Sequence, residues 1–357
     1  MQAYIHVPFC SSRCKYCRFA SSNLDTRNIK VYFKYLEREI NNFNLKTEKL
    51  NTIYFGGGTP TSVDFSYIKN ILVLLKNKFG FSKNIEITLE TTPQNITENN
   101  LILWQKSGIN RISMGLQSLN NNTLKEIGRE NKEVILNNLN LLKKSKFKNI
   151  NIDFILGLPH EKPGEKLNQI KFILKNYKKI KHISVYMLEN YNYPKSWDNI
   201  RLSEDDFNSE YNEINLYLKQ NDFDRYELSN FAIKNYECKH NIGYWEHKNY
   251  IGFGLGSHSF IDNTRFNNSD NFKEYYQNIS ENLEKNKEFL TKNNIILEKI
   301  LFQIRGNGIE KKYFKYLDEE KIDNFIKLNM LKISRNKLKI TEKSFSLVDY
   351  ILGEIIL

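Results

Sequence analysis

Residues 10–19 read CSSRCKYCRF and place three cysteines, Cys10, Cys14 and Cys17, within eight positions. The only other cysteine of the chain is Cys238. Thiolates select zinc, copper(I) or iron–sulfur clusters. A structural zinc site takes a second pair of cysteine or histidine ligands, and that pair is missing here. Three thiolates on one short loop instead predict an iron–sulfur cube with three irons held by the protein and a fourth iron open to another ligand.

The overall composition predicts a folded chain with a large core. Of its 357 residues, 40% are hydrophobic and 13% aromatic, which suits one large domain and a smaller one. No apolar run reaches the roughly 18 residues of a membrane-spanning helix. The N-terminus MQAYIHVPF lacks the charged and apolar regions of a signal peptide. Because clustered cysteines also differ from a secreted disulfide framework, we expect a cytoplasmic protein.

The formal charge of the chain is +12, from 53 Lys and Arg against 41 Asp and Glu. Such a charge can indicate nucleic acid or an anionic membrane surface. Lysine is spread along the whole chain and interleaved with asparagine, whereas arginine is scarce, which favours compositional bias. No interleaving of arginine with aromatic residues marks a base-reading surface. Nucleic acid is therefore not an expected partner, while a carboxylate-bearing ligand is compatible with the charge.

Short runs rich in β-branched and aromatic residues alternate with stretches that have apolar residues at helical spacing. The strand-like runs are residues 2–9, 51–57, 85–93, 111–118, 150–159 and 182–188. The helical stretches include residues 31–43, 65–79, 97–108 and 166–179. Alternation of this kind predicts parallel βα units. About six units fit before residue 220, too few for a closed eight-stranded barrel, which leaves an open, partial barrel or a doubly wound sheet.

Polar groups gather at the ends of the predicted strands. Cys10 follows the first strand, GGGTP (56–60) the second and Glu90 the third. Gln117 ends the fourth strand and Asp153 lies in the fifth. Because sites of parallel α/β folds lie at the carboxyl ends of the strands, these segments are expected to converge on one cavity.

The pattern changes after a further predicted strand at residues 224–232. Residues 235–260 are expected to form a loop rich in histidine and aromatic residues, and residues 262–288 a polar helical linker. Helices and the hairpin-like LKISRNKLKIT (331–341) follow, which together suggest a small winged-helix-like domain. The expected divisions are a core at 1–232, the loop and linker at 233–290, and a C-terminal domain at 291–357.

The spacing of Cys10, Cys14 and Cys17 after a first strand resembles the signature of the radical S-adenosylmethionine (SAM) superfamily. The resemblance implies a 4Fe–4S cluster on these cysteines, with the amino and carboxylate groups of SAM on the open iron. It also implies an α/β fold, a partial (βα)6 TIM-like barrel. Cys238 is the other candidate for the fourth position, but it lies far away in the sequence beside a different motif.

Two segments match the oxygen-independent coproporphyrinogen III oxidase-like family within this superfamily. They are GGGTP (56–60), whose glycines allow close backbone approach to a ligand, and GINRISMGLQSL (108–119). The resemblance implies that residues of these two segments, of the cysteine loop and of YIHVPFC (4–10), IEITLE (85–90), EIGREN (126–131) and NIDFILGLP (151–159) bind SAM or surround it and the cluster. These residues are Tyr4, Tyr16, Gly57, Gly58, Thr59, Glu90, Gln117, Arg129 and Asp153. Relatives carry histidine two residues after Arg129, where this chain has Asn131.

Three features separate the oxidases of this family from its heme chaperones. The oxidases have an additional cysteine where this chain has Phe19, and a substantial extension where only nine residues precede Cys10. The chaperones carry an HNxxYW motif, which this chain has at residues 240–245. The resemblance therefore implies a heme chaperone.

The HNxxYW motif supplies the groups that heme requires. Heme iron takes an axial His, Cys or Tyr ligand, and the macrocycle packs against flat apolar surfaces. We expect His240 to be the axial ligand or an essential part of the heme site, with Tyr244 and Trp245 as its apolar wall. His258 and Cys238 remain alternative iron ligands.

The resemblance also implies partners. Heme would be delivered to acceptor proteins, including respiratory enzymes at the inner face of the membrane. A homodimer and the cleavage of SAM both remain open, and no residue is assigned a catalytic role. The alternative function is a radical SAM oxidoreductase acting on a porphyrinogen, in the manner of a coproporphyrinogen III dehydrogenase.

Overall fold

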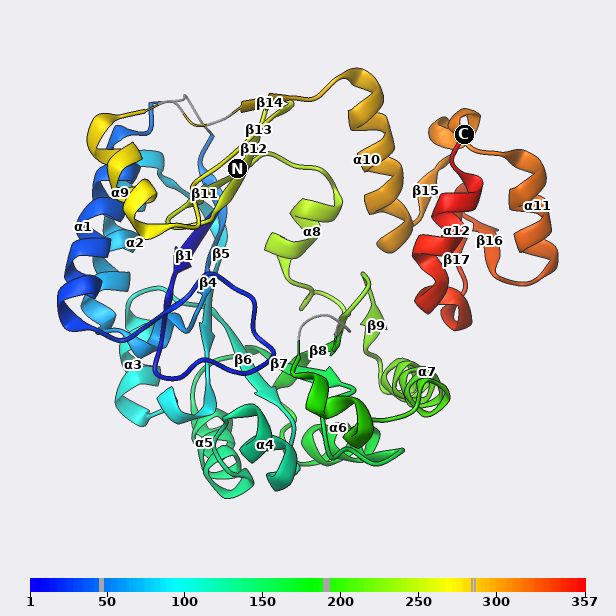
Figure 1. Ribbon diagram of the computed structural model, residues 1–357, viewed down its shortest axis with the longest axis horizontal. Coiled ribbons are helices and arrows are strands. Elements are labelled where there is room, and N and C mark those ends of the chain that lie inside the picture. Colours follow the sequence, from blue (N-terminus) through cyan, green and yellow to red (C-terminus); the bar gives the residue numbers. More distant parts are fainter. Residues whose placement is uncertain (45–47, 189–192, 284, 286) are drawn as a thin grey trace.

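One mixed β-sheet carries the candidate site (Figure 1). The computed structural model describes residues 1–44, 48–188, 193–283, 285 and 287–357. Across these residues, twelve strands pair in the order β14-β13-β12-β11-β1-β4-β5-β6-β7-β8-β10-β9. The strands from β1 to β8 in this order are mutually parallel. They are β1 (Gln2–Val7), β4 (Leu50–Gly57), β5 (Phe81–Thr91), β6 (Arg111–Gln117), β7 (Asn149–Leu156) and β8 (Ile180–Met187).

Helices connect the parallel strands and surround the sheet in Figure 1. They are α1 (Thr26–Asn42), α2 (Phe65–Phe79), α3 (Glu98–Lys106), α4 (Asn121–Ile127), α5 (Lys132–Lys144), α6 (Glu165–Asn176) and α7 (Glu204–Gln220). Most begin where a polar side chain accepts a hydrogen bond from a free backbone N–H. Asp25 does so for α1 and Asn131 for α5, so Asn131 has a local structural role. Short 3-10 turns lie at Pro60–Ser62, Pro93–Asn95 and Lys195–Ile200.

The two faces of the parallel strands differ in chemistry. Successive side chains of a strand point to opposite faces. Buried apolar residues such as Ile53 and Phe55 pack with the helices in the main core. Alternate positions carry polar groups such as Thr52 and Tyr54, whose hydroxyls bond to His240 and Glu90. The helices therefore cover the apolar face, and the polar face is left for the site.

The chain between residues 224 and 290 is more ordered than the sequence suggested. The single strand expected at 224–232 is wrong: the segment forms two antiparallel strands, β9 and β10, and the carboxylate of Glu227 accepts from the Ser229 N–H in the turn between them. The loop expected at 235–260 is also wrong, because it contains helix α8 and two strands. The expected helical linker is helical only in α9 and contains two further strands. These elements are β9 (Asp224–Arg225), β10 (Asn230–Ala232), α8 (Lys239–Trp245), β11 (Tyr250–Phe253), β12 (His258–Ile261), β13 (Thr264–Asn267), α9 (Phe272–Glu281) and β14 (Lys287–Phe289).

This segment extends the sheet beyond β1. Strand β11 pairs in parallel with β1, and β12, β13 and β14 follow as antiparallel strands. A small separate sheet joins β2 (Phe9–Cys10) to β3 (Ser22–Asn23) and closes the base of the cysteine loop.

The C-terminal residues build a second apolar core around Ile300, Leu338 and Ile351. Its elements are α10 (Lys292–Arg305), β15 (Ile309–Glu310), α11 (Glu319–Lys327), β16 (Leu331–Ser334), β17 (Lys337–Ile340) and α12 (Val348–Ile355), with 3-10 turns at Lys311–Tyr316 and Glu342–Leu347. The expected hairpin is present as β16 and β17, and its turn residues Arg335 and Asn336 have φ of 51° and 60°.

The predicted fold class, a partial barrel with a small winged-helix-like C-terminal unit, is confirmed. The exact division into three domains stays a prediction. No helix among the described residues has both the length and the apolar character needed to cross a membrane.

Candidate functional site

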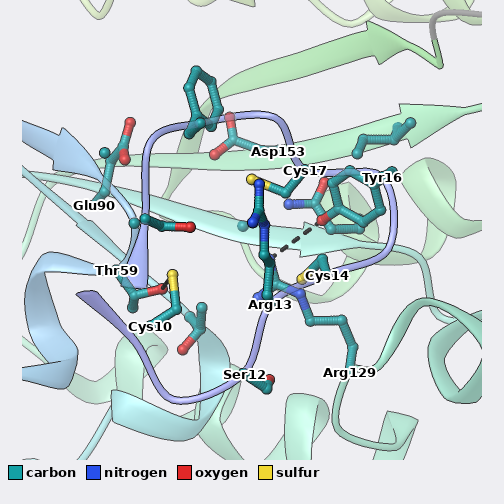
Figure 2. Close-up of a pocket in the computed structure, with 18 of the residues that line it drawn as sticks. Cys10, Ser12, Arg13, Cys14, Tyr16, Cys17, Thr59, Glu90, Arg129 and Asp153 are labelled. Atoms are coloured by element: carbon teal, nitrogen blue, oxygen red, sulfur yellow. Dashed lines mark hydrogen bonds between the residues drawn. The ribbon is translucent and has the colours of Figure 1, made fainter. Parts of the chain in front are cut away.

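Cys10 ends β2, Cys14 and Cys17 lie in the loop between β2 and β3, and all three line one cavity of about 640 Å³ (Figure 2). All three are partly exposed, and the side chain of Arg13 extends between them. Burial raises the pKa of Cys10 and of Cys17, so these thiols stay protonated at neutral pH unless a cation stabilises the thiolate. Within the described ranges, no three His, Cys, Asp or Glu side chains stand close enough to hold a single metal ion.

Two glycines let the end of β4 pass against the cysteine loop. A Cβ on Gly58 would lie 2.7 Å from the Phe9 carbonyl oxygen and 2.9 Å from the Cys10 sulfur. Gly57 has φ of +113°, and a Cβ there would lie 2.8 Å from the His6 ring. Thr59 then donates its hydroxyl toward the Cys10 sulfur over 3.7 Å. The GGGTP segment therefore forms a wall of the cysteine cavity that larger residues would disrupt.

Two carboxyl groups reach the same cavity from β5 and β7. Glu90 accepts a hydrogen bond from the Tyr54 hydroxyl at 2.7 Å, and burial, together with the nearby charge of Asp153, raises its pKa to about 7. Asp153 accepts from the Asn151 amide at 2.7 Å and from the Ser113 hydroxyl at 3.3 Å. Burial raises its pKa as well. The cavity thus holds two carboxyl groups whose pKa values are raised, and a bound ligand that donates hydrogen bonds to them would favour their charged forms.

Gln117 and Arg129 complete the cavity beside the cysteine loop. Gln117 ends β6 with φ of +69°, and its Oε1 is buried without a hydrogen-bond partner among the described residues. Arg129 follows the left-handed Gly128 at the end of α4 and donates to the Tyr16 hydroxyl at 3.3 Å. This contact ties α4 to the cysteine loop.

Eight of the nine residues that the resemblance assigned to SAM therefore share one cavity with the three cysteines. Tyr4 is the exception. It lines a neighbouring cavity of about 630 Å³ together with His6 and His258, and it donates or accepts a hydrogen bond with His6 Nδ1 at 3.1 Å. The alternation of residues along the strands could have identified Tyr54, Ser113 and Tyr186 as further lining residues, which the motifs did not mark.

The HNxxYW motif forms helix α8, which packs on the polar face of β1, β4 and β5. Gln2 donates to the backbone of His240, and Glu86 accepts from its N–H. His240 is 1% exposed, and its ring places Nδ1 2.7 Å from the Thr52 hydroxyl and Nε2 2.9 Å from the Tyr244 hydroxyl. Burial lowers the pKa of His240 to about 3, so the imidazole is neutral.

The two alternative iron ligands differ from each other in accessibility. Cys238 is fully buried, with its sulfur 3.6 Å from a Glu86 carboxylate oxygen, and burial raises its pKa to about 12. His258 begins β12, is exposed, and lines the 630 Å³ cavity beside Tyr244 and Tyr250.

Tyr244 and Trp245 line a third cavity of about 490 Å³, the aromatic cavity, whose walls combine aromatic side chains with the charged residues Glu227, Lys248, Arg265 and Glu298. Trp245 packs edge-on against Phe302 of α10, with ring centroids 5.9 Å apart. His247 bonds through Nε2 to Glu298 of the same helix at 2.8 Å, and Arg265 pairs with Glu298 at 2.7 Å. The sequence did not predict four residues of this cavity: His247, Arg265, Glu298 and Phe302. No local sequence pattern connects α10 with the HNxxYW motif. The one available signal was His247, a histidine two residues after Trp245.

Comparisons with known proteins agree with this geometry. The family model described as the radical SAM superfamily matches residues 4–173. "Heme chaperone HemW" of Lactococcus lactis subsp. lactis (strain IL1403) is 31% identical, over 99% of this chain and 97% of that protein. "Heme chaperone HemW" of Bacillus subtilis (strain 168) is 30% identical, over 87% of this chain and 85% of that protein. Among solved structures, coproporphyrinogen III oxidase of Escherichia coli, a radical SAM enzyme, has a TM-score of 0.83 at 22% identity, over 99% of this chain and 89% of that chain, and so shares the fold.

Proposed function

Because this chain belongs to the HemW family of the radical SAM superfamily, we propose that it is a heme chaperone that carries a 4Fe–4S cluster and SAM, binds heme and delivers it to acceptor proteins. The observation that carries the proposal is the aromatic cavity of about 490 Å³ to which the HNxxYW helix presents Tyr244 and Trp245. The cysteine cavity is separate from it, with Tyr186 lining both.

The residues of the first cavity fit a cluster and SAM. Cys10, Cys14 and Cys17 are soft donors on one loop and would hold three irons. When bound, the cluster supplies an open iron position and an electron for SAM. Gly57, Gly58 and Thr59 expose backbone at which the amino group of SAM would lie, and Glu90 would accept from SAM.

Gln117 supports this assignment because its buried Oε1 lacks a donor among the described residues. A buried acceptor without a partner costs free energy, and a hydroxyl or amino group of SAM would satisfy it. Arg129, fixed by Tyr16, and Asp153 complete the polar lining. Tyr4 would support the site through the adjacent His6.

The aromatic cavity of about 490 Å³ fits a flat apolar ring with charged edges. Its walls include Trp245 and Phe302 in edge contact, and aromatic surfaces of this kind pack well against a macrocycle. Arg265 and Lys248 also line it and would face the propionates of heme. Glu298 already pairs with Arg265, so a propionate would share this guanidinium.

His240 is buried and does not itself line the aromatic cavity, so Tyr244 would have to move for this histidine to act as the axial ligand. A histidine that binds a metal usually has its second ring nitrogen held by another group, and Thr52 holds Nδ1 at 2.7 Å. The Tyr244 hydroxyl occupies Nε2, which is the position that iron would take. Heme binding would therefore exchange one hydrogen bond, Tyr244 to Nε2, for an iron–nitrogen bond. The ring is neutral at physiological pH, as a metal ligand must be.

The delivery of heme to membrane respiratory enzymes, a cytoplasmic location at the inner membrane face and a homodimer complete the proposal. They rest on the family alone.

Titration of hemin, followed by its Soret band, tests the heme site. We expect wild type to bind, His240→Ala to bind more weakly with a shifted band, and Cys10→Ala to bind normally because the cluster cavity is separate. His258→Ala and Cys238→Ala serve as the alternative ligand variants. If His240→Ala kept the affinity and spectrum of wild type, the heme would lie elsewhere.

A further inference from the structure

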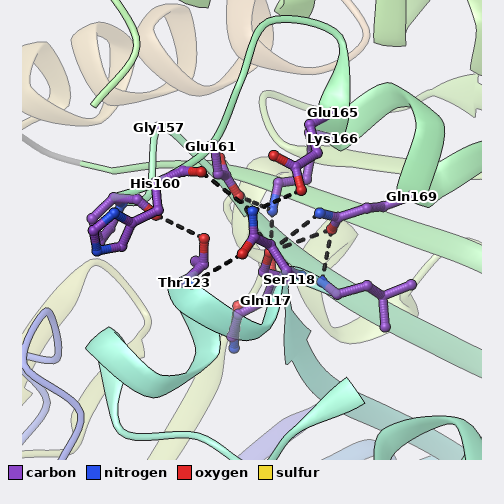
Figure 3. A network of polar contacts seen from close by, with 12 residues as sticks. Gln117, Ser118, Thr123, Gly157, His160, Glu161, Glu165, Lys166 and Gln169 are labelled. Atoms are coloured by element: carbon purple, nitrogen blue, oxygen red, sulfur yellow. Dashed lines mark hydrogen bonds and ion pairs between the residues drawn. The ribbon is translucent and has the colours of Figure 1, made fainter. Parts of the chain in front are cut away.

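A buried ion pair between Lys166 and Glu161 lies next to Gln117, the last residue of β6 (Figure 3). Lys166, in the first turn of α6, has a side chain that is 0% exposed, and its Nζ lies 2.5 Å from Glu161 Oε1. The same ammonium donates to the carbonyl oxygen of Gln117 at 2.7 Å and lies 5.6 Å from the centre of the Phe154 ring. Neither charged residue lines the cysteine cavity, whereas Gln117, which accepts from Lys166, does.

Gln117 adopts a backbone conformation that other interactions must stabilise. Its φ of +69° is left-handed, a region that costs free energy for a residue with a side chain. The register between β6 and β7 shifts between Gly115 and Gln117, so the strand bulges at this point. A bulge re-aims the side chain of the residue it contains.

The turn after Gln117 is held from the same side. The Leu119 N–H donates to Gln169 Oε1 at 2.8 Å, and the Ser118 hydroxyl lies 3.4 Å from both Glu161 Oε1 and Gln169 Oε1. Glu161, Lys166 and Gln169 therefore grip three consecutive residues, and Figure 3 shows the network converging on this turn.

The bulge fixes where the Gln117 amide points. A Cβ on Gly115 would lie 2.8 Å from Gln117 Nε2, so the amide folds tightly over that glycine. Its Oε1 is buried and has no partner among the described residues, and Gln117 itself is one of the residues that line the cysteine cavity. A change of backbone at Gln117 would move this acceptor.

We propose that Lys166, neutralised by Glu161, is a positioning residue for the nucleoside ligand of the cysteine cavity. It holds the Gln117 carbonyl so that the backbone stays left-handed and the amide oxygen faces a hydroxyl or amino group of SAM. This inference rests on the proposed SAM site. It explains why a buried charge pair, which repays its desolvation only with good geometry, lies behind a cavity that it does not touch.

A double-mutant cycle on SAM affinity tests the inference. SAM binding to the reconstituted, full-length protein is measured by calorimetry for wild type, Lys166→Met, Gln117→Ala and the double variant. We expect each single variant to bind SAM at least about tenfold more weakly, because both lose the contact between the Gln117 amide and SAM. The double variant should bind no more weakly than Gln117→Ala, since Lys166 acts through Gln117. Lys175→Met, on the exposed face of the same helix, should bind as wild type does.

A second variant covers the case in which Lys166→Met does not fold. Glu161→Gln keeps an acceptor for Lys166 but removes the negative charge, and it should also weaken SAM binding. Thermal melting and iron content are measured on every variant. Wild-type SAM affinity in Lys166→Met or in Glu161→Gln, with only a lowered melting temperature, would overturn the inference and leave a purely structural role. Additive losses in the double variant would also overturn it. Wild type that failed to bind SAM at all would overturn the proposed SAM site itself.

Discussion

Replacing Tyr244 with phenylalanine is expected to tighten heme binding. The Tyr244 hydroxyl lies 2.9 Å from His240 Nε2, the nitrogen that we assign to iron. A neutral hydrogen bond contributes about 0.5 to 1.5 kcal/mol net. If heme must break this bond, its removal should raise the affinity roughly two- to twelvefold. The aromatic ring, and with it the wall of the cavity, is retained.

Thr52→Val tests the same His240 geometry and is expected to weaken heme binding, whereas Tyr244→Phe is expected to tighten it. The Thr52 hydroxyl holds Nδ1 at 2.7 Å, and loss of a group that orients a metal ligand costs about 10- to 100-fold in metal affinity. The assay is a hemin titration read at the Soret band, with Tyr350→Phe, an exposed tyrosine of α12, as the matched control. Unchanged affinity in both Tyr244→Phe and Thr52→Val, together with a loss in His258→Ala, would refute ligation by His240.

Further predictions concern pH, the cluster and the imidazole. Glu90 has a pKa raised to about 7, so it becomes protonated as the pH falls through that value. Because the charged carboxylate is the better acceptor for SAM, SAM affinity should fall as the pH is lowered from about 8 to about 6. Glu90→Gln should remove that pH dependence. Anaerobic reconstitution should give about four irons per chain and should fail in Cys14→Ala, whereas an equal failure in Cys238→Ala would show that Cys238 is a cluster ligand. His240 has a pKa lowered to about 3, so it stays neutral at about pH 5, where an ordinary imidazole with a pKa of about 6.5 is protonated. Heme bound through His240 should therefore keep its Soret band at about pH 5. Loss of the band with a midpoint at about pH 6.5 would contradict ligation by His240.

The parallel half of the fold was predictable because its information is local. Strand-like runs and helical stretches alternate in the sequence, and the carboxyl ends of parallel strands meet at one edge. Glu90, Gln117 and Asp153 accordingly share a cavity with the cysteines. The position of Tyr4 in a neighbouring cavity was not predictable. Its place in a predicted strand does not tell how far along the barrel axis its side chain lies, and therefore which cavity it reaches.

The region after residue 232 was harder to predict because its structure depends on distant partners. Strand β11 is defined by pairing with β1, almost 250 positions earlier in the chain, and Gly252 interrupts the alternation of its four residues. Helix α8 is stabilised by Gln2 and Glu86 from β1 and β5. Phe302 reaches the aromatic cavity from α10. None of these contacts leaves a local pattern.

The central claim is best tested by presenting heme and coproporphyrinogen III to the same anaerobic sample of cluster-loaded protein with SAM. We expect a saturable Soret band on addition of hemin, weakened by His240→Ala, and no detectable decarboxylation of coproporphyrinogen III under reducing conditions. Production of protoporphyrinogen without saturable heme binding would contradict the chaperone assignment and favour the oxidoreductase.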